Sequence, residues 1–228
     1  LDHKLGDLFP AGVDTPTVAA SALASATALA TAVAGITLRQ LLDHTSGLAA
    51  WRPYFQVLKK LPEEVRRRCL LDLLLAEPLE ASPGRRFCYS DLGYLLLGEI
   101  VAAVSGEGLD DYVSGRLFAP LGLDDLCFAP LSRPLPFALN RVAATELCPW
   151  RGQRPTGRVH DDTAYVLGGV AGHAGLFGTA AAVGQLLAHL LKAYCGENPG
   201  PLSPAMVRYA WRRERSTPHG LGFDFPAA

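Results

Sequence analysis

The sequence predicts a globular domain built mainly of helices, with few strands. Its 228 residues are 49% apolar and 19% charged, which is enough to bury the core of one large domain. Helix-capping residues repeatedly precede apolar residues with a 3.6-residue period, whereas the alternating pattern of a half-buried strand is scarce. We therefore expect helices to form most of the fold.

Six helices are expected, each from a residue suited to a first turn. Side-chain oxygens at an N-cap accept a backbone N–H, and proline at the first helical position loses nothing by lacking one. The residues expected to begin helices are Thr37, Pro62, Ser90 or Asp91, Leu109, Thr179 and Ser203. Gly47 and Gly106 are expected to end two of them in the left-handed conformation that glycine tolerates. The expected spans are 37–47, 62–76, 90–106, 109–118, 179–194 and one from 203 onward.

Three further stretches have other patterns. Residues 17–34 are rich in Ala, Thr and Ser and are interpreted as an insertion or helix, since they carry too little hydrophobicity for a membrane span. Residues 129–160 are proline-rich and lack periodicity, which predicts a long irregular excursion with a short strand at 141–145. The glycines within 164–191 predict a turn-rich loop that leads into a helix.

Composition narrows the range of partners. With 21 basic and 22 acidic side chains the formal net charge is -1, so no nucleic-acid partner is expected. The odd number of cysteines, with no C-x-x-C pair, predicts neither a zinc site nor a disulfide framework, and no cofactor is expected. Reduced thiols favour a cytoplasmic location, and a periplasmic one stays open. The cysteines are Cys69, Cys88, Cys127, Cys148 and Cys195.

Four segments contain recognisable motifs, namely ITLRQLLDHTSGL, PGRRFCYSDLGY, PLGL and GGVAGHAGLFGTA. They resemble segments of the serine hydrolases of the class C β-lactamase and penicillin-binding-protein superfamily. Residues 36–48 (ITLRQLLDHTSGL) are similar to the segment that follows the nucleophile in that family. Residues 83–94 (PGRRFCYSDLGY) resemble its second motif, and residues 120–123 (PLGL) resemble the next landmark. Residues 168–180 (GGVAGHAGLFGTA) are similar to the glycine-rich turn before a later helix. The four segments occur in the family's order and span most of the chain.

The resemblance implies an α+β fold of the β-lactamase/transpeptidase type, in which a helical lobe packs beside an antiparallel sheet formed from both chain ends. It also implies an acylating serine in a Ser-x-x-Lys motif, a Tyr-x-Asn motif and a third motif of Lys or His, a small residue and Gly. No Ser-x-x-Lys occurs in 1–228, and the third motif would follow the 221–224 segment. We therefore expect a single domain over 1–228, truncated at both ends, mainly the helical lobe with the central sheet incomplete, and inactive by itself.

Tyr89 and Asp91 are the catalytic candidates that the resemblance implies. Tyr89 would relay a proton, taking it from the serine during acylation and giving it to the leaving group. A phenol has a pKa of about 10, so this role needs a stabilised anion, to which the following helix N-terminus would contribute. Asp91 stands where the family commonly has Asn. A carboxylate cannot donate an amide hydrogen to a substrate carbonyl, which favours esters over lactams or peptides.

The segments outside the second motif offer three more candidates. His160, Asp161 and His173 are expected to line the cleft and bind substrate, and His160 and Asp161 could instead order the long loop. As a further alternative the three form a metal site, although their spacing matches no recurring zinc motif. His173-Ala174-Gly175 also has the residue order of the third motif, but its neighbours favour a tight glycine turn. His44 and Ser46 are a candidate base and nucleophile; two residues apart at a helix end, they are better explained by local bonding to the backbone.

The expected function is hydrolysis of an ester, amide or lactam through an acyl-enzyme, as in an esterase, a D,D-peptidase or a β-lactamase. The expected partner is therefore a small-molecule substrate. A non-catalytic binding protein on the same scaffold is the first alternative. A metal-dependent hydrolase that uses His160, Asp161 and His173 is the second. The sequence leaves the oligomeric state open.

Overall fold

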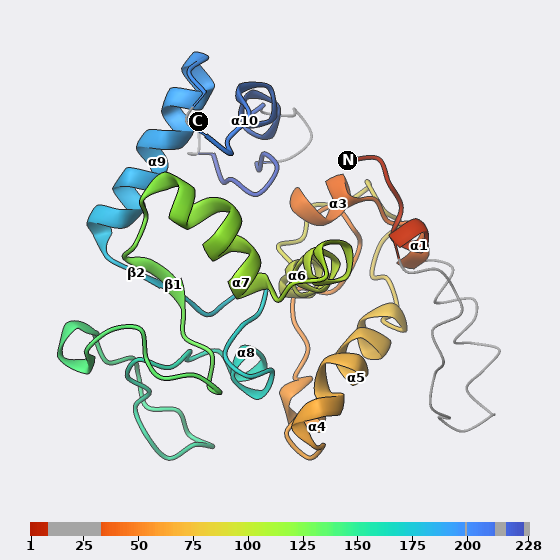
Figure 1. The fold of residues 1–228 in the computed structure, drawn as a ribbon. Coiled ribbons are helices and arrows are strands. Elements are labelled where there is room, and N and C mark those ends of the chain that lie inside the picture. The colour runs from red at the N-terminus through yellow and green to blue at the C-terminus, as the bar shows by residue number, and fades with distance from the viewer. Residues whose placement is uncertain (9–32, 199, 213–217, 226–228) are drawn as a thin grey trace.

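The computed structural model describes residues 1–8, 33–198, 200–212 and 218–225. Helix α6 (Asp91–Ser105) crosses the middle of the molecule and contacts α1 (Leu5–Leu8), α3 (Leu38–Leu42), α5 (Glu63–Leu75) and α7 (Leu109–Val113) (Figure 1). Helices α9 (Ala180–Cys195) and α10 (Pro204–Ala210) pack together beside this group. Two short helices, α4 (Phe55–Leu58) and α8 (Asp162–Val166), contact each other near α5.

The sheet of the described ranges has two short strands, β1 (Leu126–Phe128) and β2 (Leu176–Gly178). They pair antiparallel, with Cys127 opposite Phe177. The fold is thus α+β and mainly helical, as predicted from the sequence. Both strands were missed because three residues are too few to show an alternating pattern.

Two groups of buried apolar residues form the core. The larger joins α1, α3, α5, α6 and α8, and the smaller lies where β1 and the chain before it meet α9. The most deeply buried side chains of the larger group include Leu41, Leu48, Leu70, Leu74, Leu92 and Leu96. Leu92 and Leu96 are one helical turn apart on α6, so the inward face of α6 is the centre of the larger core.

Helix α3 begins as predicted and ends earlier. Thr37 and Gln40 form a capping box, because each side chain accepts the other residue's backbone N–H. The helix stops at Leu42 and Gly47 lies beyond it, which corrects the expected end. Gly47 has φ +81, and a Cβ there would stand 2.0 Å from the carbonyl oxygen of Ala81. Glycine is therefore required at position 47 by a close crossing of two loops.

The caps of α6 settle a choice that the sequence left open. Ser90 is the N-cap, since its Oγ accepts the N–H of Gly93, and Asp91 is the first helical residue. Gly106 ends the helix with φ +71, as predicted. Ser90 Oγ also donates to the carbonyl of Ala49, so the cap ties α6 to the loop after α3. This bond fixes the position of the residues just before α6.

Several predicted spans need correction. The helix expected over 109–118 ends at Val113 and continues as a π-helical turn, Ser114–Phe118, and a 3-10 turn, Ala119–Leu121, because Pro120 cannot extend an α-helix. The strand expected at 141–145 is absent from this described segment, where a 3-10 turn covers Leu139–Arg141. Thr145 instead bonds the carbonyl of Pro155 through both its N–H and its hydroxyl.

The remaining helix predictions are confirmed where the structure describes them. Helix α5 follows Pro62, Thr179 caps α9 by accepting the N–H of Ala182, and Ser203 precedes α10. The Ala-rich tract 17–34 lies outside the described residues except for its last two positions. No single described helix is long and apolar enough to cross a membrane; α6 and the chain over Leu109–Leu121 pass that test only together, across a 75° bend.

Candidate active site

Tyr89 lies in the loop immediately before α6, and its side chain is 60% exposed. Its ring stacks on the imidazole of His44, with ring centroids 4.3 Å apart and planes inclined by 28°. Within the described chain no residue forms a hydrogen bond with its hydroxyl. A phenol that is exposed yet held by a buried ring can present its oxygen to a bound molecule.

His44 is buried, with only 3% of its surface exposed. Its Nδ1 accepts the backbone N–H of Ser90 at 3.0 Å, so the ring is the neutral tautomer that carries its proton on Nε2. Burial, and then the neighbouring His219, lower the pKa of His44 to about 4. His44 therefore stays neutral and keeps this acceptor at physiological pH.

Other aromatic side chains complete the surroundings of His44. The ring of Tyr94 in α6 also stacks on the His44 ring, with centroids 4.9 Å apart, and the Tyr94 hydroxyl donates to the carbonyl of Leu42 at 3.2 Å. Burial raises the pKa of Tyr94 to about 12, so this hydroxyl stays protonated. His219 meets the edge of His44 at 5.3 Å, stacks on Phe87 and lies 3.5 Å from a carboxylate oxygen of Asp224. No sequence pattern indicated that Tyr94, Phe87 and His219 surround His44.

Asp91 begins α6, and its N–H donates to the carbonyl of Ala50 at 2.9 Å. Burial raises the pKa of the Asp91 carboxyl; the charge of His173 acts to lower it and that of Asp161 to raise it. The structure thus brings Asp91 into the electrostatic reach of two of the predicted substrate-binding residues.

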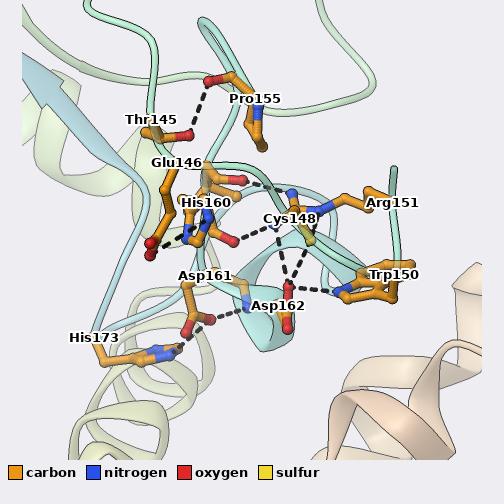
Figure 2. Close-up of polar contacts among 12 residues, drawn as sticks. Thr145, Glu146, Cys148, Trp150, Arg151, Pro155, His160, Asp161, Asp162 and His173 are labelled. Carbon is orange, nitrogen blue, oxygen red and sulfur yellow. Dashed lines mark hydrogen bonds and ion pairs between the residues drawn. The ribbon is translucent and has the colours of Figure 1, made fainter. Parts of the chain in front are cut away.

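Asp161 and His173 form a direct pair (Figure 2). Nε2 of His173 lies 3.0 Å from Oδ1 of Asp161, and the same oxygen accepts the N–H of Ala164 as the N-cap of α8. Burial acts to raise the pKa of Asp161, but the hydrogen bond and charge of His173, with the helix N–H groups, hold it below its usual value. The His173 side chain is 7% exposed, and its Nδ1 has no hydrogen-bond partner among the described residues.

His160 lies apart from the Asp161–His173 pair. Its ring faces Glu146, with Nε2 4.0 Å from a carboxylate oxygen, and Figure 2 shows it directed away from His173. No group of three or more His, Cys, Asp and Glu in the described part of the chain is arranged to hold a metal ion. The alternative of a metal site on His160, Asp161 and His173 therefore finds no support in this geometry.

Arg151 is the residue of this region that sequence reasoning missed. Its side chain is 3% exposed, and its guanidinium donates to the carbonyls of Val159 and His160 and to Oδ1 of Asp162 (Figure 2). Nε of Arg151 also donates to Sγ of Cys148, and Nε1 of Trp150 donates to the same carboxylate oxygen of Asp162. These bonds fold the excursion 129–160 onto the start of α8. An arginine in an irregular, proline-rich segment gives no sequence signal for such a role.

His44 and Ser46 do not form a base–nucleophile pair. Ser46 Oγ accepts the N–H of Leu48 at 3.3 Å, while Nδ1 of His44 is bonded to Ser90. The interpretation as local bonding to the backbone is confirmed for Ser46. His173 lies in the turn before β2, as its glycine neighbours predicted.

Two surface cavities, of about 270 and 240 Å³, share Glu63, Ser132 and Gly168. The first lies between α5, α6 and the 167–172 turn, and the second lies between α5, the 131–132 segment and the 165–168 segment. Tyr89, Asp91 and His173 are not among the lining residues of either. The candidate site is therefore defined by its side chains and not by these cavities.

The comparisons with known proteins agree on one family. A sequence model of the Beta-lactamase family matches residues 12–226. A protein of Escherichia coli strain K12, provisionally named a D-alanyl-D-alanine carboxypeptidase, is 39% identical over 133 residues, which are 53% of this chain and 30% of the relative. A protein of the same name from Salmonella schwarzengrund is 36% identical over 151 residues, 60% of this chain and 34% of the relative. The chain thus spans about a third of the length of these relatives.

Solved structures agree on the fold. SurE aligns with a TM-score of 0.66 and 24% identity over 98% of this chain and 46% of its own. A D-stereospecific amidohydrolase from Streptomyces aligns with a TM-score of 0.61 and 21% identity over 97% of this chain and 62% of its own. Because the family model covers nearly all of 1–228 and the fold agrees with it, the chain belongs to the Beta-lactamase family.

Proposed function

We propose that the protein carrying this chain is a serine hydrolase that forms an acyl-enzyme, with Tyr89 as its proton relay. The observation that carries this proposal is the setting of Tyr89, an exposed phenol stacked on a buried neutral imidazole at the start of α6. Tyr89 stands directly before the N-cap of α6, at the end of the helix that carries a positive partial charge. A phenolate there would take the proton of an attacking serine and return it to the leaving group.

The serine itself is proposed to come from outside residues 1–228, because no serine in this sequence has a lysine three residues later. The family's chemistry uses such a pair, and an acyl-enzyme cannot form without the alcohol. By the same argument residues 1–228 alone are inactive.

The proposed substrate class is an ester, amide or lactam, and the peptide amide is the first to test. The relatives named as D-alanyl-D-alanine carboxypeptidases support the amide. Asp91 stands where the family commonly has Asn, and a carboxylate cannot donate the hydrogen bond that an amide would give to a substrate carbonyl, which supports the ester. We propose that Asp91 orients the acyl group and that Asp161, His173 and His160 border the substrate.

The test uses the full-length protein with three probes: a peptide ending in D-Ala-D-Ala, a p-nitrophenyl ester and a penicillin. We expect a covalent adduct, seen as a mass increase, with at least one probe, and turnover with the peptide or the ester. Tyr89→Phe should lower kcat/KM by about 100-fold or more, since general acid–base catalysis contributes that much. Tyr112→Phe, on the exposed side of α7, is the matched control and should leave the rate unchanged.

Binding of a probe without an adduct or turnover would identify a non-catalytic binding protein and overturn the proposal. Equal rates for Tyr89→Phe and Tyr112→Phe would remove Tyr89 from the mechanism. A product burst from residues 1–228 alone would show that the nucleophile lies within them.

A further inference from the structure

We propose that His44 is a positioning residue for Tyr89, which holds the phenol ring and the backbone on both sides of it in one place. The inference rests on the proposed role of Tyr89 and adds to it a residue that does not touch the reacting atoms. His44 lies in the segment 36–48, for which the proposed mechanism has no other use.

Three consecutive residues contact His44. The N–H of Cys88 donates to the His44 carbonyl at 2.9 Å, the Tyr89 ring stacks on the imidazole, and the N–H of Ser90 donates to Nδ1 at 3.0 Å. The two hydrogen bonds fix the backbone before and after Tyr89, and the stacking restricts its ring. A phenol that is 60% exposed would otherwise have several rotamers available.

The backbone of His44 is in an unfavourable conformation. Its φ is +59, and among the described residues it is the single non-glycine residue with positive φ. Such a conformation persists where the surroundings determine it, and glycine or asparagine would adopt it more readily. Because a strained position is occupied by histidine, we infer that its side chain supplies something that glycine cannot, and the contacts with Tyr89 and Ser90 are what it supplies.

The bond to Ser90 exists only while Nδ1 is unprotonated, since a protonated ring would place an N–H against an N–H. Among the residues that the structure describes, the groups that face His44 are Tyr94 from α6, Phe87 and Tyr89 from the loop before it, and His219, which also pairs with Asp224. Asp43, the adjacent residue of the chain, accepts from Thr45. Acid that protonates His44 is therefore expected to release the backbone at Ser90 and loosen Tyr89.

Two substitutions of His44 separate its hydrogen bond with Ser90 from the stacking and titration of its ring. In His44→Asn the side-chain Oδ1 occupies the place of Nδ1, so the acceptor for Ser90 remains, asparagine tolerates the left-handed backbone, and the titratable ring is lost. In His44→Ala the acceptor and the ring are both lost. His3→Asn, at an exposed histidine near the N-terminus, is the control for the substitution itself.

The first measurement is the pH dependence of kcat and KM of the full-length protein with the best substrate of the preceding test. At neutral pH His44→Ala should lower kcat by about 100-fold with KM little changed, because a displaced catalytic group costs about that much in rate. The kcat of His44→Asn should be about tenfold higher than that of His44→Ala. The acid limb of wild type, with its midpoint near the His44 pKa of about 4, should be absent in His44→Asn. A uniform loss in both variants, with the acid limb unchanged, would overturn the proposal.

The second measurement needs no turnover and so separates this inference from the proposed function. In protein labelled with ¹³C at the tyrosine ring and ¹⁵N at histidine, NMR should show His44 as the Nε2–H tautomer at pH 7. The Tyr89 ring signal should shift with the same midpoint as His44, and this shift should disappear in His44→Asn but not in His3→Asn. If Tyr89 does not respond while His44 titrates, the proposal fails even in an active enzyme; if wild type has no turnover but the coupled shift is present, only the proposed function fails.

Discussion

Nε2 of His173 lies 3.0 Å from Oδ1 of Asp161, and this pair joins the glycine-rich turn before β2 to the first turn of α8. The same Oδ1 accepts the N–H of Ala164 at 2.7 Å. One carboxylate therefore both caps a helix and binds a buried imidazole. Asp91, at the start of α6, responds to the charges of both residues, so the beginnings of α6 and α8 share one electrostatic environment.

Replacing Asp161 should distinguish its two roles. Asp161→Ala loses the cap and the bond to His173, and we expect it to lower the free energy of unfolding by about 2–4 kcal/mol. Asp161→Asn keeps an acceptor for Ala164, because asparagine is an equally good N-cap, and should cost about 1 kcal/mol less than Asp161→Ala. Urea unfolding at pH 7 measures both. Equal losses would mean that the cap contributes nothing.

Acid should destabilise the fold through His44. Its folded pKa is about 4, below the 6.5 of a free histidine, so the unfolded chain binds a proton first as the pH falls. The stability that the neutral His44 contributes is fully present above about pH 6.5 and is lost as the pH falls from there to about 4. Between pH 7.5 and pH 4.5 the free energy of unfolding of the wild type should fall by about 2–3 kcal/mol more than that of His44→Asn. Each pKa unit between the folded and unfolded states corresponds to about 1.4 kcal/mol. Equal losses in denaturant titrations at these two pH values would contradict the burial of a neutral imidazole.

The helices that the sequence predicted correctly are those with local signals. Thr37, Ser90 and Thr179 each accept the backbone N–H of the residue three positions ahead, and such bonds depend only on neighbours along the chain. The short strands β1 and β2 depend on pairing across 50 residues, which no local pattern records. The loop crossing at Gly47 is likewise a tertiary contact, and for this reason its glycine was taken for a helix end.

In the candidate site, too, the residues with a local sequence signal were predicted and those placed by tertiary contacts were not. Tyr89 and Asp91 were found through the resemblance of their segment, and the Asp161–His173 contact joins two of the three residues that were expected to line the cleft together. The residues that hold these side chains in place, His44 and Arg151, could not be predicted from the sequence. His44 contacts Ser90 across 46 positions, and its position looked like an ordinary helix end. The role of Arg151 is likewise set by carbonyls and a carboxylate that only the folded chain brings together.

Arg151 should be required for the fold of the excursion. Arg151→Met leaves the carbonyls of Val159 and His160 and the carboxylate of Asp162 without their buried donor, and we expect a loss of about 3–5 kcal/mol. Arg154→Met, at an exposed position of the same segment, is the control and should change stability by less than about 0.5 kcal/mol. Denaturant unfolding of the two variants tests this. Similar small losses would show that the guanidinium bonds contribute little.

Gly172 should tolerate no side chain, because the turn before β2 touches α6 through its backbone. A Cβ at position 172 would stand 2.0 Å from the carbonyl oxygen of Tyr94 and 2.9 Å from the nitrogen of Gly98. Gly172→Ala should therefore push the turn away from α6 and cost about 2–3 kcal/mol. Gly184→Ala is the matched control, since a Cβ there meets nothing within 4 Å and alanine favours the interior of α9. It should stabilise the protein by about 0.5–1 kcal/mol, so thermal unfolding of the two variants should shift in opposite directions; a shift in the same direction would mean that the backbone contact between Gly98 and Gly172 is not tight.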